Sequence, residues 1–150
     1  MTEWIPRVTV ATVIAREDRY LLVEERDKHS GELVFNQPAG HLERGETLAA
    51  AALRETLEET GWEVRLQGVL GVALYTAPAN GVTYYRTTFL AEPVAPVAGA
   101  LLDADIHAVH WLDYGWICAH AGRMRSALVI ADIDRHRSGV VYPLDIVAHL

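Results

Sequence analysis

The sequence predicts an α/β fold in which a mixed β-sheet carries helices on its faces. Strand-like segments come first, and a helix-like segment bounded by glycines follows them. Strand-like segments then return before a largely helical C-terminal third. Elements in this order usually bury a sheet between helices. A length of 150 residues suits one domain with a real core, so a single domain over 1–150 is expected.

Two strands joined by a hairpin are predicted at the N-terminus. Residues 7–15 are rich in Val and Thr and almost continuously apolar, which is typical of a buried strand. Residues 17–19 have the composition of a turn, and residues 20–25 predict the second strand.

Residues 33–37 form a short extended segment, because Pro38 disfavours helix at the residue before it. Residues 37–43 are therefore expected to reach the next element as a loop. Backbone carbonyls in such a loop are free to face a metal ion.

A helix is expected between Thr47 and Gly61. The Thr47 hydroxyl can cap its start, and residues 49–53 are strong helix formers. Gly61 suits the left-handed position that follows a helix end. At about 100° per residue, one side of this helix is small and apolar and should pack on the sheet. That side contains Ala49, Ala50, Leu53, Leu57 and Thr60.

Three carboxylates, those of Glu55, Glu58 and Glu59, are predicted on the opposite side of this helix, with Arg54 placed to reach Glu58 at i+4. One interpretation is a solvated acidic face. The other is a site for a hard divalent ion, Mg²⁺ or Mn²⁺, which prefers oxygen ligands. The absence of Lys from residues 40–62 favours the metal site, because little else there would relieve the repulsion.

The next part of the chain predicts an antiparallel pair. Residues 63–75 can form a bent or broken strand, residues 79–81 a turn, and residues 82–91 a strand with two distinct faces. Residues 92–100 carry two prolines and a glycine and are expected to be a loop.

The C-terminal third predicts a strand over 106–112 and a short helix over 114–120. A longer helix is expected over 124–137, with Leu128 and Ile130 inward. Residues 142–150 are expected to form a tail with one or two helical turns.

Composition excludes several classes of protein. A net charge of −7 argues against binding to a nucleic-acid polymer, which needs a basic patch. A signal peptide and a membrane span are not expected, because no apolar run approaches about 20 residues. The single cysteine, Cys118, excludes an internal disulfide framework and fits the cytoplasm; it is expected to be a small buried side chain.

The segment from Gly40 to Trp62 resembles the Nudix box, Gly-x5-Glu-x7-Arg-Glu-U-x-Glu-Glu-x-Gly-U, where U is a bulky aliphatic residue. Thr56 and Trp62 depart from the U positions, which pack rather than react. Every fixed position matches, namely Gly40, Glu46, Arg54, Glu55, Glu58, Glu59 and Gly61.

The resemblance implies an α/β/α sandwich and metal-dependent water attack on a pyrophosphate linkage. Glu46 and Arg54 look like the supporting pair that links loop to helix in this family. The metal ligands that the resemblance implies are the Ala39 carbonyl, Glu46, Glu55, Glu58 and Glu59.

Members of the family differ in their general base. Some use a glutamate of the box, and others an acid from a distant loop. Asp103 and Asp105 both precede Trp111, and Asp105, six residues before it, resembles a base or metal ligand of several relatives. The expected catalytic residues are therefore Glu55, Glu58, Arg54 and Asp105.

Substrate recognition is less clear from the sequence. His41, Arg26 and Arg86 are candidates for contact with substrate, although solvated side chains would look the same. The expected partner is a small phosphoanhydride, and the sequence leaves monomer and homodimer open.

A closer resemblance is to the NudJ-type phosphatases of the superfamily. It rests on residues 36–43, Arg-Ser at 125–126, and Ser138-Gly139 with the following Tyr142-Pro143-Leu144. It implies removal of phosphate from nucleoside di- and triphosphates, and action on hydroxymethylpyrimidine pyrophosphate and thiamine pyrophosphate. Hydrolysis of ADP-sugars or dinucleoside polyphosphates is the alternative. A non-catalytic nucleotide-sensing module is a third reading, but such modules usually lose box acids that this chain retains.

Overall fold

The computed structural model describes residues 2–150, in which a seven-stranded mixed sheet has the order β3-β2-β1-β6-β5, with β4 beside β1 and β7 beside β2. β1 and β6 run parallel, and the other neighbours are antiparallel. The strands are β1 Arg7–Arg16, β2 Arg19–Arg26, β3 Leu33–Asn36, β4 Ala39–His41, β5 Trp62–Thr76, β6 Thr83–Pro96 and β7 Ile106–Asp113.

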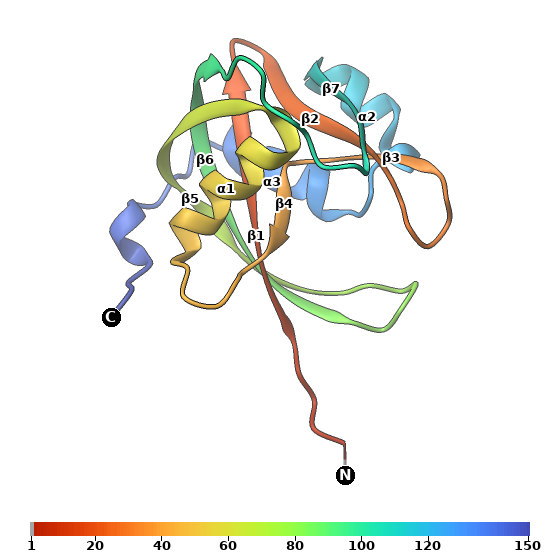
Figure 1. Cartoon of the computed structure of the whole chain (residues 1–150), viewed down its shortest axis with the longest axis vertical. Helices are drawn as coiled ribbons and strands as arrows, with labels where there is room; N and C mark the ends of the chain where they lie inside the picture. The colour runs from red at the N-terminus through yellow and green to blue at the C-terminus, as the bar shows by residue number, and fades with distance from the viewer. Residues whose placement is uncertain (1) are drawn as a thin grey trace.

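Helices cover both faces of the sheet, with α1 in front and α3 behind in Figure 1. Neighbouring residues of β5 point to opposite layers: Val69 packs with the α1 residues and Leu70 with the α3 residues. The α/β/α sandwich is thus confirmed. The helical segments are α1 Leu48–Thr60, α2 Tyr114–Ala119, α3 Leu128–Arg137 and the short 3₁₀ turns Ala121–Arg123 and Leu144–Ile146.

β1 lies inside the sheet, which explains its almost continuous apolar sequence. Val10 packs into the α1 layer and Val13 into the α3 layer, and both are fully enclosed. A strand covered on both faces needs apolar residues at alternate and intervening positions alike. The predicted strand over 7–15 is confirmed.

The ends of α1 are also confirmed. Thr47 Oγ1 accepts a hydrogen bond from the Ala50 N–H at 3.0 Å, which caps the first turn. Gly61 has φ 72°, and its N–H donates to the Leu57 carbonyl.

The prediction of which side of α1 faces the sheet was right for Ala49 and Thr60 and wrong for the exposed Ala50, Leu53 and Leu57. Leu53 and Leu57 are 41% and 42% exposed. The buried residues are Ala51, Ala52, Thr56, Glu59 and Thr60. The two threonines can be buried because each hydroxyl donates to the carbonyl four residues earlier, so neither leaves an unpaired polar group.

Two predicted loops contain strands. β4 pairs with β1, within the segment 37–43. β6 continues to Pro96 and so includes part of the segment 92–100. Its pairing with β1 ends at Ala91, so prolines beyond that point lie where β6 has only β5 as a neighbour.

The buried residues of α3 are Val129, Asp132 and Ile133 instead of Leu128 and Ile130, which are only half-buried. Cys118 is exposed, so the prediction of a buried cysteine was wrong. No helix within residues 2–150 has the length and apolar character needed to cross a membrane.

Candidate active site

Arg54 joins the loop before α1 to the helix. Its Nε donates to Glu46 Oε2 at 2.6 Å and its Nη2 donates to Glu46 Oε1 at 2.8 Å, a paired contact of the strong charge-assisted kind. These bonds lower the pKa of Glu46 to about 2 and raise that of Arg54. Both Glu46 oxygens are thus engaged by Arg54. The predicted supporting pair is present, and the geometry places Glu46 in it rather than in the acidic group below.

An acidic group forms beside this pair. Ligand oxygens of Glu55, Glu58 and Asp103 all lie within 4.8 Å of one another. Asp103 comes from the loop before β7, and its N–H donates to the Glu58 carbonyl at 2.9 Å. Arg54 Nη1 contacts both glutamates, at 2.8 Å and 3.2 Å. We refer to Glu55, Glu58 and Asp103 as the acidic group.

Glu59 lies apart from the acidic group, so the expected trio of Glu55, Glu58 and Glu59 on one exposed side is not observed. Glu59 is buried, and its Oε1 accepts a hydrogen bond from the Ala39 N–H at 2.7 Å. Burial raises its pKa to about 9, because a charged carboxylate is costly to remove from water. A bound cation would offset this cost.

The Ala39 carbonyl is available in the way that the resemblance implies. β4 bonds to β1 through alternate residues: the Thr12 N–H donates to Pro38 and the Leu42 N–H donates to Val8. Backbone groups of the intervening residues Ala39 and His41 therefore point away from β1. The Ala39 N–H meets Glu59, and the His41 carbonyl accepts from Arg54 Nη2 at 3.1 Å.

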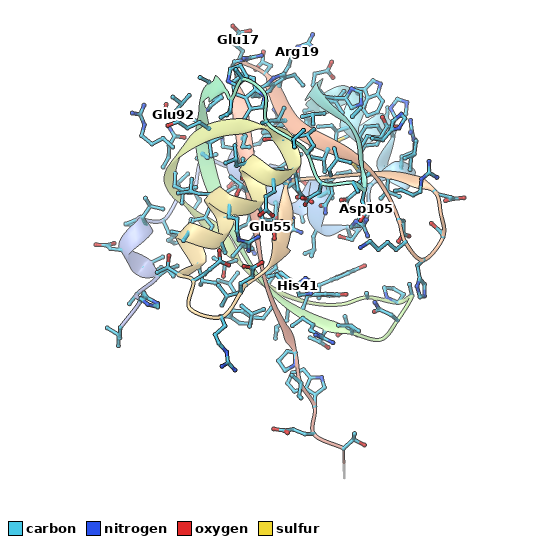
Figure 2. The ribbon with its side chains drawn as sticks, in the orientation of Figure 1. Glu17, Arg19, His41, Glu55, Glu92 and Asp105 are labelled. Atoms are coloured by element: carbon cyan, nitrogen blue, oxygen red, sulfur yellow. The ribbon has the colours of Figure 1, made fainter. Side chains whose placement is uncertain are left out.

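Gly40 lets the Glu55 carboxyl approach β4 closely. A Cβ at residue 40 would overlap that carboxyl, so any larger residue would require Glu55 to move. Burial raises the pKa of Glu55, while the hydrogen bond from Arg54 opposes the rise. In Figure 2, Glu55 lies beside α1 and β4, with His41 below it and Asp105 to its right.

A cleft of about 820 Å³ begins at β4, and the predicted substrate residues all line it. Its walls come from β4, from the loop after β2, from the β5–β6 hairpin and from the loop before α3. The lining includes Ala39, Gly40, His41, Arg26, Lys28, Asn36, Tyr75, Tyr84, Arg86, Asp105 and Arg125.

The predicted substrate residues differ in their surroundings. Arg26 Nη1 donates to the Gly31 carbonyl at 2.5 Å, and the exposed His41 ring contacts Tyr84 edge-on. Arg86 is 6% exposed, and its Nη2 lies 3.0 Å from Asp132 Oδ2. Burial lowers the pKa of Arg86, and the Asp132 carboxylate opposes that effect.

Asp105 lies outside the acidic group. Its carboxylate contacts the exposed Lys28 Nζ at 3.1 Å. Asp103, the other aspartate of this loop, is the one that lies in the acidic group. Both aspartates could be picked out from the sequence. Only the structure shows that Asp103 lies beside Glu58, because its N–H donates to the Glu58 carbonyl.

Sequence reasoning also missed Glu25. This buried side chain accepts from Arg125 Nε at 2.6 Å and adds to the negative charge around Glu59. The two residues are far apart in sequence, and nothing in the local composition of β2 sets Glu25 apart.

The donor set fits a hard divalent cation. The acidic group, Glu59 and the Ala39 carbonyl offer only oxygen, which Mg²⁺ and Mn²⁺ prefer. Arg54 offsets part of the repulsion between Glu55 and Glu58, but the pKa of Glu55 is still raised. Of these groups, Ala39 lines the cleft, so a metal held here would be placed to bind a polyphosphate.

A three-layer α/β fold with this acidic helix defines a class of hydrolases, and comparison with known proteins identifies it. The NUDIX domain model matches residues 5–132, and the chain belongs to the Nudix family. It is a Nudix hydrolase that acts on pyrophosphate bonds of small molecules.

The chain is also similar to individual members of the family. The chain is 37% identical to phosphatase NudJ of Escherichia coli K12 over 142 residues, which cover 95% of this chain and 90% of the relative. A NUDIX hydrolase from Nitrosomonas europaea has a structure with a TM-score of 0.94 and 40% identity, covering 97% of this chain and 98% of that one. A UDP-X diphosphatase shares the fold with a TM-score of 0.70 at 15% identity, covering 97% of this chain and 70% of that one.

Proposed function

We propose that this enzyme uses Mg²⁺, with Mn²⁺ as an alternative, to hydrolyse nucleoside di- and triphosphates and related pyrophosphates. The observation that carries the proposal is the acidic group, whose Glu55 carboxyl lies against Gly40, a residue of the cleft lining. The similarity to phosphatase NudJ over nearly the whole chain supports a phosphate-releasing activity. Hydroxymethylpyrimidine pyrophosphate and thiamine pyrophosphate are included among the proposed substrates.

Glu55, Glu58, Glu59 and the Ala39 carbonyl would hold the metal, with Asp103 added to this set and Glu46 kept as the partner of Arg54. A bound divalent ion neutralises phosphate oxygens and lowers the pKa of water. Arg54 fixes the acids in place through its bonds to the loop and the helix. His41, Arg26 and Arg86 would contact the substrate.

Two side chains are candidates for the general base. Glu55 is half-buried, and burial raises the pKa of its carboxyl, which makes the carboxylate a stronger proton acceptor. Asp105 lines the cleft but is paired with Lys28. We propose Glu55, and a much larger loss of kcat in Glu55→Gln than in Asp105→Asn would agree with that choice. The reverse order would assign the base to Asp105.

The test of function is release of phosphate and pyrophosphate with Mg²⁺. The panel contains nucleoside di- and triphosphates, thiamine pyrophosphate, ADP-ribose and a dinucleoside polyphosphate. Broad phosphate release from the first two groups is expected. Selective cleavage of ADP-ribose or the dinucleotide would replace the proposed substrates with the alternative class.

Metal dependence is tested with EDTA and with Glu59→Gln. Both are expected to remove most activity, the substitution by at least about 10-fold because it neutralises a carboxylate of the proposed site. Glu63→Gln changes an exposed glutamate on β5 and serves as the matched control. Equal turnover in the two folded variants would exclude Glu59 from the metal site.

We also propose that the enzyme acts in the cytoplasm, in line with its single cysteine. Monomer and homodimer remain the two proposed states, and sedimentation would decide between them.

A further inference from the structure

The cleft contains a buried amide that has no partner in the protein. Asn36, the last residue of β3, is 7% exposed and lines the cleft. Its Oδ1 is enclosed and accepts no hydrogen bond from residues 2–150. Buried amides are almost always bonded. This unpaired amide belongs to a residue of the cleft lining, where a ligand can supply the missing partner once the amide turns.

A second polar group, the guanidinium of Arg86, lines the same cleft. Its Nη2 donates a hydrogen bond at 2.8 Å to Gln37, the neighbour of Asn36 in the chain. Arg86 Nε and Nη2 are engaged by protein atoms, whereas Nη1 has no hydrogen-bond partner within the described residues. Arg86 also lines the cleft, so this guanidinium can donate into it.

The charge of Arg86 is balanced within the protein. Asp132 is buried and accepts from Arg86 Nε at 3.1 Å and from Thr88 Oγ1 at 2.9 Å. A guanidinium paired in this way attracts a further anion less than a free one would, but it still donates hydrogen bonds. The part of the cleft lined by Asn36 and Arg86 is therefore better suited to bind a neutral polar group than a phosphate.

An aromatic surface lines the same cleft. Tyr75 of β5 and Tyr84 of β6 are direct cross-strand partners, and Tyr84 contacts the His41 ring. Aromatic side chains offer a planar apolar surface to a flat ring. Figure 1 shows the hairpin that carries them extending beyond the body of the sheet, below the β2–β3 region.

We propose that Asn36 and Arg86 bind the polar edge of a neutral ring in the substrate, such as the amide or amidine edge of a nucleobase. Asn36 is then a specificity-determining residue. The amide can rotate to present either its oxygen or its nitrogen, so it can accept or donate. This inference rests on the proposed function, because it places the ring of a phosphoanhydride substrate.

The test compares Asn36→Leu on two substrates: a nucleoside triphosphate and inorganic tripolyphosphate, which has no ring. A side chain that bonds only to a ligand can become apolar without loss of stability. The melting temperature without ligand is therefore expected to stay the same or rise. The kcat/KM for the nucleoside triphosphate is expected to fall roughly 10-fold, while that for tripolyphosphate stays unchanged.

Thr12→Val is the matched control. Thr12 Oγ1 is the other enclosed side-chain atom without a hydrogen-bond partner among residues 2–150, and it lies on β1 outside the cleft lining. Both variants should keep their melting temperature, but only Asn36→Leu should lose discrimination between the two substrates.

Two results would overturn the inference. One is an equal loss on both substrates, and the other is a fall in melting temperature of more than about 5 °C, which would show that the amide has a structural role. If Asn36→Leu does not fold, Asn36→Ala replaces it.

Binding without turnover separates this inference from the proposed function. Calorimetric titration with a nucleoside monophosphate, in EDTA, should show roughly 10-fold weaker binding to Asn36→Leu than to the unmodified protein. Unchanged binding would reject the inference even if the enzyme is active. If Asn36→Leu binds the nucleoside monophosphate more weakly but the unmodified protein hydrolyses none of the tested substrates, the inference about Asn36 is kept and the proposed function is rejected.

Discussion

At the scale of single residues, two glutamates of one motif have opposite electrostatic environments. The guanidinium of Arg54 holds the pKa of Glu46 near 2, whereas burial raises that of Glu59 to about 9. Glu46 therefore stays charged and fixes the loop. Glu59 is poorly compensated in the absence of a cation, so the same kind of side chain has a structural role at one position and is a proposed metal ligand at the other.

We expect the metal-free protein to lose stability as pH rises from about 5 to 9. A carboxyl whose pKa is raised on folding, here from 4.5 to about 9, favours folding fully below the lower value and no longer above the higher one. Urea unfolding in EDTA should show this fall, with a slope of at most about 1.4 kcal/mol per pH unit. Glu59→Gln should remove the slope while its amide oxygen still accepts from Ala39; equal slopes in both proteins would contradict this account.

Gly40→Ala should reduce kcat/KM by at least about 10-fold, because the new methyl group would displace the Glu55 carboxyl. Gly122→Ala is the control, since a methyl group there meets open space. Steady-state kinetics with saturating Mg²⁺ compares the two. Similar activity in both variants would mean that Glu55 can move without loss of function.

At the scale of elements, α1 is a helix whose buried side is small and partly polar. Ala51 and Ala52 allow a close approach to the sheet, and Glu59 reaches β4 from the same side. The larger Leu53 and Leu57 are left half-exposed.

Ala52→Leu should therefore destabilise the protein by about 1–3 kcal/mol, because it overpacks the contact between helix and sheet. Ala50→Leu, two residues earlier on an exposed position, should change stability by less than about 0.5 kcal/mol. Urea unfolding measures both. A larger loss of stability in Ala50→Leu than in Ala52→Leu would mean that the helix face predicted from the sequence is the buried one.

The sequence predicted the ends of α1 but not its buried side. Caps depend on neighbours three or four residues away, so Thr47 and Gly61 could be assigned from local sequence. The buried side depends on a hydrogen bond between Glu59 and Ala39, which lies outside the helix. For the same reason the sequence preferred Asp105, whereas the contact of Asp103 with Glu58 crosses more than 40 residues.

At the scale of the whole molecule, a buried ion pair connects the sheet to α3. Arg86 of β6 and Asp132 of α3 meet at 3.0 Å, and Gln37 bonds both Arg86 and the Val129 carbonyl. The network joins the floor of the cleft to the rear layer of the sandwich.

Asp132→Asn should cost about 3–5 kcal/mol in the free energy of unfolding, because it leaves a buried guanidinium without its counter-charge. Asp134→Asn, on the exposed side of the same helix, keeps an oxygen that can accept from the Tyr114 hydroxyl and should cost less than about 0.5 kcal/mol. Chemical denaturation of both variants is the measurement. Equal free energies of unfolding for the two variants would mean that water or a rearrangement of nearby side chains compensates the buried charge of Arg86.

The parallel pairing of β1 with β6 also bears on how the protein is made. β1 leaves the ribosome first, yet its long partner begins only where Tyr84 faces Arg7. Until then this apolar strand has only its hairpin with β2 and the three-residue β4 beside it. The nascent chain thus carries an unfinished, aggregation-prone centre until β6 has been made. The proposed ion site is completed later still, once Asp103 has been added.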